Sequence, residues 1–487
     1  MNRYDCLLLE VPLLLFSSNI FLFLFLPCTV LIYYLLHKPY RNMFLFMASL
    51  LFYAWGEPKF VFVMLGSIAI NYVFALMINR TRDKKRLCKM FVVVAVAGNL
   101  GILFIFKYLD FFIRNINLIG FDFPLKGIIL PIGISFFTFQ EISYIVDVYR
   151  QNAKAQTKPQ NIGLYISLFP QLIAGPIVRY QTIADQIESR KESIDDFSEG
   201  VKRFIIGFSK KILIANNMAL IADKAFGLPD AERSVLYAWV GAIAYSFQIL
   251  FDFSGYSDMA IGLGKMFGFH FLENFNYPYI SKSISEFWRR WHISLGQFFR
   301  DYVYFPLGGS RVKSKWRLLL NLFVVWALTG VWHGASWNFV IWGLFYFVLI
   351  AFEKLSGYPE KFHNSYAKLL YRLFTLLCVI GGWVLFRSIG AKSALKYGLS
   401  MFGLKDNAFF CDNVILSFRE YWLFLLAAVL CSTNLFKWLR QKVDAAKTKA
   451  LRTTVNITSV GIYAFLMMWS VSYIILGSHN PFIYFNF

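Results

Sequence analysis

Residues 326–343 read W-A-L-T-G-V-W-H-G-A-S-W-N-F-V-I-W-G, and this stretch decides the class of fold. It lies inside a longer segment, from Arg317 to Glu353, within which no Asp, Glu, Lys or Arg occurs. A helix that crosses a bilayer needs roughly 20 predominantly apolar residues, so the segment is long enough for a membrane span. The sequence therefore favours a membrane protein over a soluble one.

His333 lies in the middle of this apolar segment. An ionisable side chain in such a place is costly and faces the protein interior or a wet cavity. Gly330 and Gly334 stand close on either side and would let a ligand or a second helix approach the imidazole. Two interpretations remain equal on these grounds: an active-site base, or a buried histidine that a neighbouring helix satisfies.

The rest of the chain repeats the apolar pattern. Of 487 residues, 58% are hydrophobic and only 16% are charged, whereas a soluble chain has about a quarter charged. The pattern predicts an all-α polytopic membrane protein with a single domain over residues 1–487 and roughly eleven spans plus re-entrant pieces. Candidate segments are 20–36, 43–55, 60–78, 90–113, 128–146, 163–174, 204–221, 237–253, 318–332, 337–352, 369–386, 421–436 and 455–476, with a further apolar piece at 7–16. Segment 163–174 is expected to be re-entrant, because Pro170, Gly175 and Pro176 interrupt or bound it.

Positive charge is in excess, with 49 Lys and Arg against 28 Asp and Glu. The basic residues cluster at 80–89, 179–203, 282–317 and 437–452. The positive-inside rule explains such clusters between spans, so we expect all four on the cytoplasmic side. The pattern gives no reason to expect nucleic acid as a partner.

Residues 281–317 differ from their neighbours because aromatic and basic residues alternate at helical spacing. Such a basic amphipathic helix usually lies at the membrane surface. Ser283 or Ser285 can cap its start, and Pro306 is expected to end the helix. His292 lies on it between two tryptophans, either as an interfacial residue or as a partner of His333 in one cavity.

The other candidate functional residues have weaker support in the sequence. His37, His270, His363 and His479 lie in polar stretches or turns and are expected to be structural or surface residues. The chain has no G-x-S-x-G nucleophile elbow, no H-E-x-x-H metal motif and no cysteine pair at metal-ligand spacing, so we predict no metal. Four carboxylates in apolar context could carry charge in a transporter or orient helices, and we favour the structural role: Glu141, Asp147, Asp252 and Asp258.

Several long motifs make the chain similar to the membrane-bound O-acyltransferase family, most of all to its bacterial polysaccharide O-acetylation branch. These motifs are F-S-S-N-I-F-L-F-L-F-L-P from Phe16, L-P-I-G-I-S-F-F-T-F-Q from Leu130, A-G-P-I-V-R from Ala174, F-D-F-S-G-Y-S-D-M-A-I-G from Phe251, N-Y-P-Y-I-S-K-S-I-S-E-F-W-R-R-W-H-I-S-L from Asn276 and L-T-G-V-W-H-G-A-S-W-N-F-V-I-W-G from Leu328. The resemblance is clearest over residues 16–353.

The resemblance implies a ring of tilted helices around a funnel, with His333 as the catalytic histidine and His292 as a second active-site position. It also implies acetyl-CoA as acyl donor, with no permanently bound cofactor, in a multi-pass protein of the bacterial cytoplasmic membrane. A histidine suits acyl transfer from a thioester to a hydroxyl, because it can accept the hydroxyl proton and pass it to the leaving thiolate. Four arginines could attract the phosphates of the donor: Arg289, Arg290, Arg300 and Arg311.

The same branch implies an extracytoplasmic acetyltransferase partner of the SGNH type that completes transfer to the glycan. Alginate, peptidoglycan, another exopolysaccharide or a teichoic acid would serve as acceptor. The runner-up activity is D-alanyl transfer to teichoic acid by the related branch of the family. A membrane glycan transporter or flippase, and a non-catalytic scaffold, are the alternatives from other classes.

Overall fold

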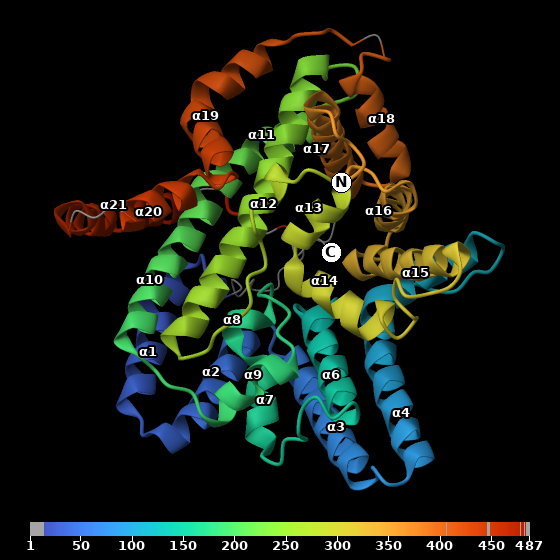
Figure 1. The fold of residues 1–487 in the computed structure, drawn as a ribbon, viewed down its shortest axis with the longest axis vertical. Helices are drawn as coiled ribbons and strands as arrows, with labels where there is room; N and C mark the ends of the chain where they lie inside the picture. Colours follow the sequence, from blue (N-terminus) through green and yellow to red (C-terminus); the bar gives the residue numbers. More distant parts are fainter. Residues whose placement is uncertain (1–13, 406, 446–448, 478, 482, 484–487) are drawn as a thin grey trace. The chain divides into compact units, whose positions relative to one another are not determined.

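The helices follow the apolar segments of the sequence. The computed structural model describes residues 14–405, 407–445, 449–477, 479–481 and 483, and within these ranges every regular element is a helix (Figure 1). Eight helical stretches in this part of the chain are long and apolar enough to cross a membrane: Phe60–Arg80, Lys85–Asn117, Ile194–Gly227, Val235–Met266, Trp337–Ser356, Ser365–Arg387, Asp412–Cys431 and Thr453–Ile475. The predicted all-α polytopic class is confirmed.

The predicted number of roughly eleven spans is not confirmed in the described part of the chain, where several apolar segments form helices that are short or carry charge. The first candidate, 20–36, forms a π turn and α1 over residues 21–35. Segment 43–55 lies in α2 (Lys38–Gly56), which begins with polar residues, and segment 128–146 yields α6 (Ile134–Tyr149). Of the 16 residues of α6, 14 are buried by protein, so its hydrophobicity serves packing as much as insertion.

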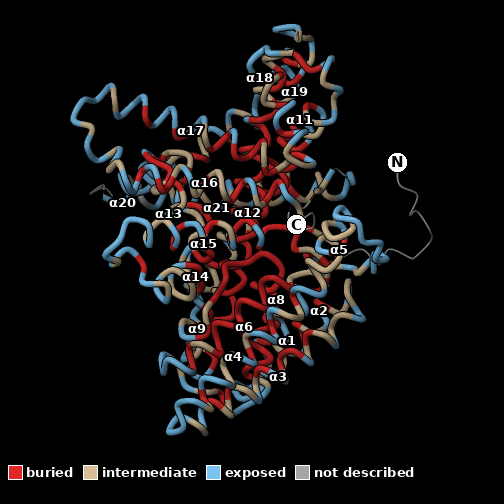
Figure 2. Tube along the Cα trace, turned by 90° about the vertical axis from the view of Figure 1, so that its right-hand side faces the viewer, coloured by how far each residue is buried: buried red, intermediate tan, exposed pale blue. Residues whose placement is uncertain are grey.

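The predicted interruption in segment 163–174 is present. Helix α7 (Pro159–Ser167) ends at Leu168, and the four-residue helix α8 (Phe169–Leu172) follows with Pro170 in its first turn. Every residue of α8 is buried (Figure 2). Broken backbone is tolerated at membrane depth where protein covers it. The apolar piece at 7–16 lies largely outside the described residues, which begin at 14.

One compact unit comprises Met1–Leu109, Lys126–Ser198 and Leu263–Phe271. In it α3 (Phe60–Arg80) and α4 (Lys85–Leu103) form a hairpin around the basic cluster at 80–89, and both pack on α6. The amides of Asn71 and Asn99 exchange hydrogen bonds of 2.8 and 2.7 Å between α3 and α4. Polar groups buried between helices are therefore satisfied across the contact.

A second compact unit comprises Asp110–Leu125, Glu199–Gly262 and Leu272–Phe487. Its α15 (Lys315–His333) and α16 (Trp337–Ser356) form an antiparallel hairpin joined by three residues. Gly330 faces Gly343, and a Cβ on Gly330 would lie 2.5 Å from the carbonyl oxygen of Phe339. The expectation that glycine beside His333 lets a second helix approach is confirmed.

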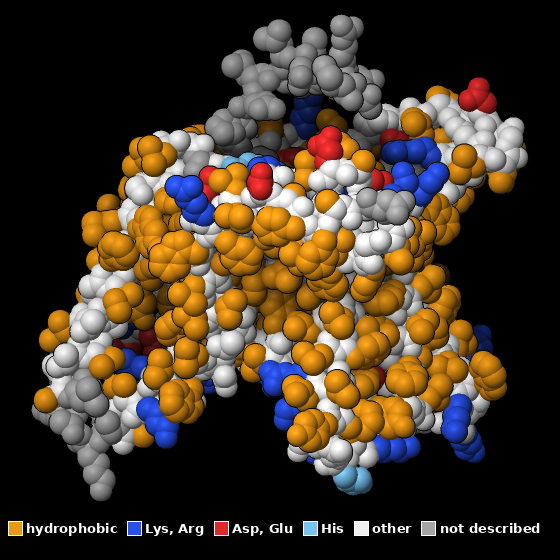
Figure 3. Space-filling view, turned by 90° about the horizontal axis from the view of Figure 1, so that it is seen from above, with side chains coloured by type: hydrophobic (Ala, Val, Ile, Leu, Met, Phe, Trp, Pro, Cys, Tyr) orange, Lys and Arg blue, Asp and Glu red, His pale blue; other side chains and the backbone are white. Residues whose placement is uncertain are grey.

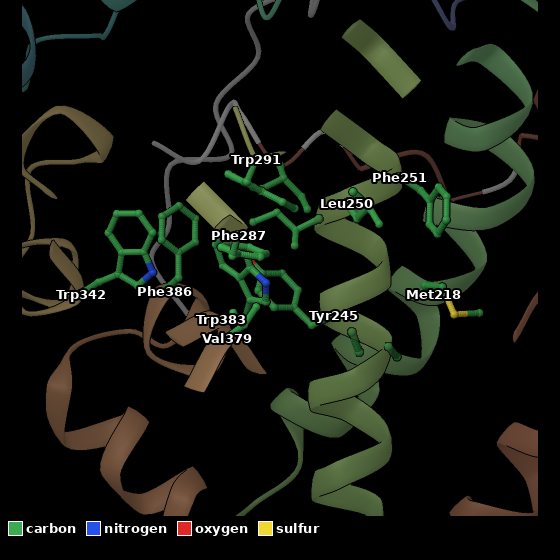
Figure 4. Packing of buried hydrophobic residues seen from close by; sticks show 14 of the residues in the cluster. Met218, Tyr245, Leu250, Phe251, Phe287, Trp291, Trp342, Val379, Trp383 and Phe386 are labelled. Atoms are coloured by element: carbon green, nitrogen blue, oxygen red, sulfur yellow. The ribbon is translucent and has the colours of Figure 1, made fainter. Parts of the chain in front are cut away.

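Aromatic side chains from several helices build the core of the second unit. Figure 4 shows rings from α12 (Val235–Met266), α13 (Ile284–Arg290), α16 and α17 (Ser365–Arg387) packed together. Trp291 lies 4.7 Å from Trp383, and Trp342 lies 5.2 Å from Phe386, between ring centroids. Fully buried aromatic side chains contribute large apolar areas to such a core.

The predicted single amphipathic helix over 281–317 is wrong in one respect, because it is broken at His292. It forms α13, then α14 (Ile293–Phe299) and a π turn, Arg300–Tyr304. Ser283 caps α13 as predicted, accepting from the amide of Glu286 at 3.1 Å. Six apolar side chains of this stretch are buried in protein: Ile284, Phe287, Trp291, Leu295, Phe298 and Phe299.

Large apolar side chains also cover much of the outer surface. Figure 3 shows hydrophobic side chains spread over the face it presents. Phe62, Leu370 and Met468 are each about two-thirds exposed or more. Soluble monomers rarely expose large contiguous apolar patches, so this surface suits contact with lipid.

Candidate active site

His333 is the last residue of α15 and lies among aromatic rings from two further helices. The centroid of its imidazole is 5.0 Å from the ring of Trp342 on α16 and 5.3 Å from that of Phe386 on α17. Trp332, its neighbour in the chain, lies 4.9 Å away. Because His333 is only 7% exposed, the imidazole faces the protein interior, as expected for an ionisable group in an apolar segment.

His292 occupies the break between α13 and α14 with a left-handed backbone, at a φ of 45°. That conformation costs a residue with a Cβ of order 1–3 kcal/mol and persists where the surroundings fix it. The ring lies edge-on to Phe253 at 4.6 Å and 6.0 Å from Trp332. Since Trp332 also contacts His333, one indole lies against both imidazoles. The structure thus brings the two predicted histidines together.

Asn274 determines which ring nitrogen of His292 carries a proton. Its Oδ1 accepts from the amide of Ser294 at 3.2 Å and from the Ser294 hydroxyl at 2.9 Å, and it lies 3.2 Å from His292 Nδ1. Because an amide oxygen only accepts, Nδ1 is the donor and Nε2 is left unprotonated. Among the described residues, Nε2 has no hydrogen-bond partner. Burial lowers the pKa of His292 well below its ordinary value, and the nearby His333 lowers it further, so the ring is neutral.

A pocket of about 270 Å³, here called the histidine pocket, lies against His292. It runs beside α15 toward His333 and also contains two cationic side chains, Arg300 and Lys354. An apolar pocket with a few polar groups is the usual form of a small-molecule site. Its lining residues are Trp288, Trp291, His292, Leu295, Gly296, Phe299, Arg300, Tyr304, Ser310, Leu322, Val325, Trp326, Thr329 and Lys354.

A second pocket of about 570 Å³, the basic pocket, borders the same helix α13. Four cationic side chains line it against two carboxylates, so it favours anions. Its lining residues are Lys282, Ser283, Glu286, Arg289, Pro359, Glu360, Lys368, Leu369 and Arg372. Of the four cations, Lys282 precedes α13, Arg289 lies near the end of that helix, and two come from α17.

The four arginines predicted for the donor do not form one cluster. Arg289 lines the basic pocket, and Arg300 lines the histidine pocket, where it also pairs with Asp301 at 2.7 Å. Arg290 pairs with Glu286 at 2.8 Å and donates to a backbone carbonyl, so its guanidinium is engaged within the protein. Arg311 lies in the connection before α15 and lines neither pocket.

A third cavity of about 710 Å³, the polar cavity, reaches the aromatic residues beside His333. Phe386, which contacts His333, is in its wall. The adjacent Arg387 forms an ion pair of 2.5 Å with Asp223, and His479 Nε2 lies 2.9 Å from the other oxygen of Asp223. The cavity combines hydrogen-bonding groups and aromatic rings: Asp223, Phe226, Gly227, Arg233, Tyr245, Gln248, Ser336, Asn338, Phe339, Phe386, Arg387, Ser388, Ile389, Ser393, Tyr397, Pro481 and Ile483.

The cavities lie toward opposite ends of three neighbouring helices. Helix α15 runs toward His333, α16 runs back from Trp337, and α17 runs in the direction of α15. The basic pocket includes residues from the α16–α17 connection, whereas the polar cavity includes residues from the α15–α16 connection and the end of α17. The two histidines therefore lie between pockets that face opposite ends of this unit.

The predicted structural role of the carboxylates agrees with their contacts. Asp252 forms a buried ion pair of 2.7 Å with Lys211, and Asp258 pairs with both Arg203 and Lys210. On α6, Glu141 accepts from the hydroxyl of Ser67 at 2.7 Å, and Asp147 is buried on the same helix.

Two side-chain contacts in these pockets could not be predicted from the sequence. Asn274 has no motif of its own, and only its side-chain hydrogen bonds to residues 18 and 20 positions later reveal its role. His479, predicted to be structural, pairs with Asp223, which lines the polar cavity, 256 residues earlier in the chain. His37 and His363 are exposed, in agreement with the prediction of surface residues, whereas His270, predicted to be structural, is exposed as well.

Comparison with known proteins identifies the family to which the chain belongs. A model of the membrane-bound O-acyltransferase family matches residues 133–358, which include both histidines. The chain is 42% identical over 401 residues to the probable alginate O-acetylase AlgI of Pseudomonas putida, covering 81% of each chain. It is 35% identical over 538 residues to the peptidoglycan O-acetyltransferase of Helicobacter pylori, covering 99% of each. It is also 31% identical to the teichoic acid D-alanyltransferase of Bacillus subtilis, over 53% of this chain and 66% of that one. This chain therefore belongs to the membrane-bound O-acyltransferase family and is a multi-pass membrane acyltransferase.

Proposed function

We propose that this acyltransferase takes an acetyl group from cytoplasmic acetyl-CoA and passes it across the bacterial cytoplasmic membrane for O-acetylation of a polysaccharide. The relatives named above for O-acetylation of alginate and peptidoglycan support the acceptor class. D-Alanyl transfer to teichoic acid is the second candidate, and it has weaker support because that relative matches only about half of the chain.

One observation carries the proposal: two buried imidazoles in contact with one indole, between pockets that face opposite ends of the helices. The basic residues at 282–317 support a cytoplasmic location for the end with the histidine and basic pockets, by the positive-inside rule. The polar cavity then faces outward. His292 lines the histidine pocket, and Phe386 beside His333 lines the polar cavity, so a donor and a hydroxyl would approach the pair of histidines from opposite sides.

His333 acts as the base in this scheme. The acceptor hydroxyl oxygen attacks the thioester carbonyl carbon, His333 accepts the hydroxyl proton, and the carbon–sulfur bond breaks. The proton then passes to the thiolate, and the products are the acetyl ester and CoA thiol. His292, which lines the histidine pocket, is neutral, and its unprotonated Nε2 can serve as a second proton acceptor. The hydrogen bond from its Nδ1 to Asn274 keeps the ring in this tautomer.

Acetyl-CoA fits the charges on the cytoplasmic end. The basic pocket supplies four cations for phosphates, including Arg289, and the histidine pocket supplies Arg300 beside an apolar channel. The donor proposal therefore rests on Arg289 and Arg300. Neither Arg290 nor Arg311 lines either pocket. No permanently bound cofactor or metal is part of this scheme.

An SGNH-type acetyltransferase on the outer side is the proposed partner that completes transfer to the glycan. The polar cavity supports an outer acceptor because it presents hydroxyl, amide and charged groups together with aromatic rings. The acceptor at this cavity is then a hydroxyl, either of the partner or of the polysaccharide itself.

The test uses sealed right-side-out vesicles from producing cells, loaded with acetyl-CoA that carries a radiolabel on the acetyl group. Label should enter the external glycan fraction with the wild-type protein and with the surface variant His37→Ala, and should not enter it with His333→Ala. Equal labelling by His333→Ala would overturn the proposal. Labelling that requires donor outside the vesicle would overturn the assigned orientation.

A further inference from the structure

Glu353 is a buried carboxylate at the cytoplasmic end of α16 that the scheme above does not use. It is 5% exposed, although it lies only three residues before the end of the helix. Among the residues that the structure describes, no Lys, Arg or His lies within ion-pair distance of it. Buried carboxylates are costly unless strong donors satisfy them, so its contacts need an explanation.

Its partners are the first two amides of another helix. One carboxylate oxygen accepts from the backbone amide of Ile284 at 2.7 Å, and the other accepts from that of Ser285 at 2.8 Å. The hydroxyl of Tyr371 on α17 donates to the first oxygen at 2.9 Å. Glu353 therefore joins the start of α13 to α16 and α17 through three short hydrogen bonds.

These contacts matter because α13 is only seven residues long. The first amides of any helix lack partners within the helix, and so short a helix closes only about three bonds of its own. The hydroxyl of Ser283 accepts from the amide of Glu286. The carboxylate of Glu353 accepts from the two preceding amides, those of Ile284 and Ser285. These bonds fix the first turn of α13, in addition to the packing of its aromatic side chains in the core.

Helix α13 carries groups of both cytoplasmic pockets. Arg289 lines the basic pocket, and Trp288 lines the histidine pocket. The chain then passes through Trp291 into the left-handed backbone of His292. Asn274 holds His292 from one side, and Glu353 holds the far end of the helix that leads to it.

We infer that Glu353 is a positioning residue, which sets the place of α13 and through it the alignment of His292 with the donor held at Arg289. This inference rests on the proposed function. Glu353 touches neither substrate nor the reacting atoms, and it acts through the two backbone amides. A glutamine at this position would offer one accepting oxygen, and its amide group would face the second backbone donor.

Amide hydrogen exchange of the purified protein tests the positioning directly. Glu353→Gln should increase exchange at Ile284 and Ser285 by about tenfold or more, because loss of a partner opens the first turn. Tyr371→Phe, which keeps both amide bonds, should change exchange less. Glu420→Gln removes an exposed carboxylate from α19 (Asp412–Cys431) of the same unit and should leave these amides as in the wild type. Unchanged protection in Glu353→Gln would overturn the inference, whatever the protein's substrate.

Kinetics in the loaded vesicles test the functional consequence. Arg289→Gln should raise the apparent KM for acetyl-CoA, and His292→Ala should lower the apparent kcat. Glu353→Gln should do both, and the double variant Glu353→Gln/His292→Ala should lose less rate than the product of the single losses, since both act through the same group. Losses that multiply independently would contradict the inference. If wild type fails to use acetyl-CoA, the proposed function fails, and the exchange result still decides the role of Glu353.

Discussion

The crossing of α15 and α16 at Gly330 permits a sharp prediction about His333, which lies three residues further along α15. A Cβ at Gly330 would lie 2.5 Å from the carbonyl oxygen of Phe339, whereas an ordinary contact there begins at 3.4 Å. The obstacle is backbone and cannot rotate away. Gly330→Ala must therefore move the two helices apart by roughly 0.9 Å, and overpacking of this kind costs about 1–3 kcal/mol.

The displacement should act on activity more than on insertion. A misplacement of about 1 Å at a reacting group can cost about 100-fold in rate, so we expect Gly330→Ala to reduce glycan acetylation by that order. The control is Gly381→Ala on α17, where a Cβ meets nothing within 4 Å. Alanine is favoured over glycine in a helix by up to about 1 kcal/mol, so this variant should keep full activity and unfold at the same or a higher temperature.

The assay compares glycan acetylation by vesicles that contain equal amounts of each variant, together with thermal unfolding of the purified proteins. Wild-type rate in Gly330→Ala would refute the reasoning that links the glycine crossing to the alignment of His333. Equal loss in Gly381→Ala would show that any added methyl group in these helices is harmful, and would refute it as well.

Two further predictions concern stability. Burial and His333 hold the pKa of His292 below its value in the unfolded chain, so the unfolded state binds the extra proton first as pH falls. The free energy of unfolding should therefore decline below about pH 6.5, by up to about 1.4 kcal/mol per pH unit. His292→Gln should flatten this decline in pH-dependent thermal unfolding. A steeper decline in the variant would contradict the assignment. Lys211→Met should destabilise the protein by about 3–5 kcal/mol because it leaves Asp252 buried and unpaired, whereas Lys211→Met/Asp252→Leu should recover much of that loss in denaturant unfolding. Additive losses would count against a buried pair.

The sequence predicted the class of fold because apolar periodicity and the scarcity of charge depend only on local composition. Most predicted segments coincide with helices. The interruption before Pro170 was predictable because proline lacks an amide N–H and disfavours helical backbone at the residue before it. The number of spans was less accessible. A helix such as α6 is apolar because protein surrounds it, and composition alone does not distinguish that cause from a lipid environment.

The site was predictable only in part, for a similar reason. His333 stands out locally as an imidazole in an apolar segment, and glycine spacing indicated the close approach of a second helix. The break at His292 gave no local signal, since no glycine or proline marks it and Asn274, earlier in the chain, helps to hold it. The four arginines lie close together in the sequence. Because the helix breaks at His292, Arg289 lines the basic pocket and Arg300 lines the histidine pocket.

The central claim is that acetyl reaches the glycan through His333. The most direct measurement is the O-acetyl content, by mass spectrometry, of cell-wall and secreted polysaccharide from cells in which His333→Ala replaces the wild-type residue, with membrane levels of the protein matched and His37→Ala as control. The assignment of His333 as the base predicts that O-acetyl groups on the polysaccharide are lost in His333→Ala and retained in His37→Ala. Wild-type acetylation in the His333→Ala cells would contradict it.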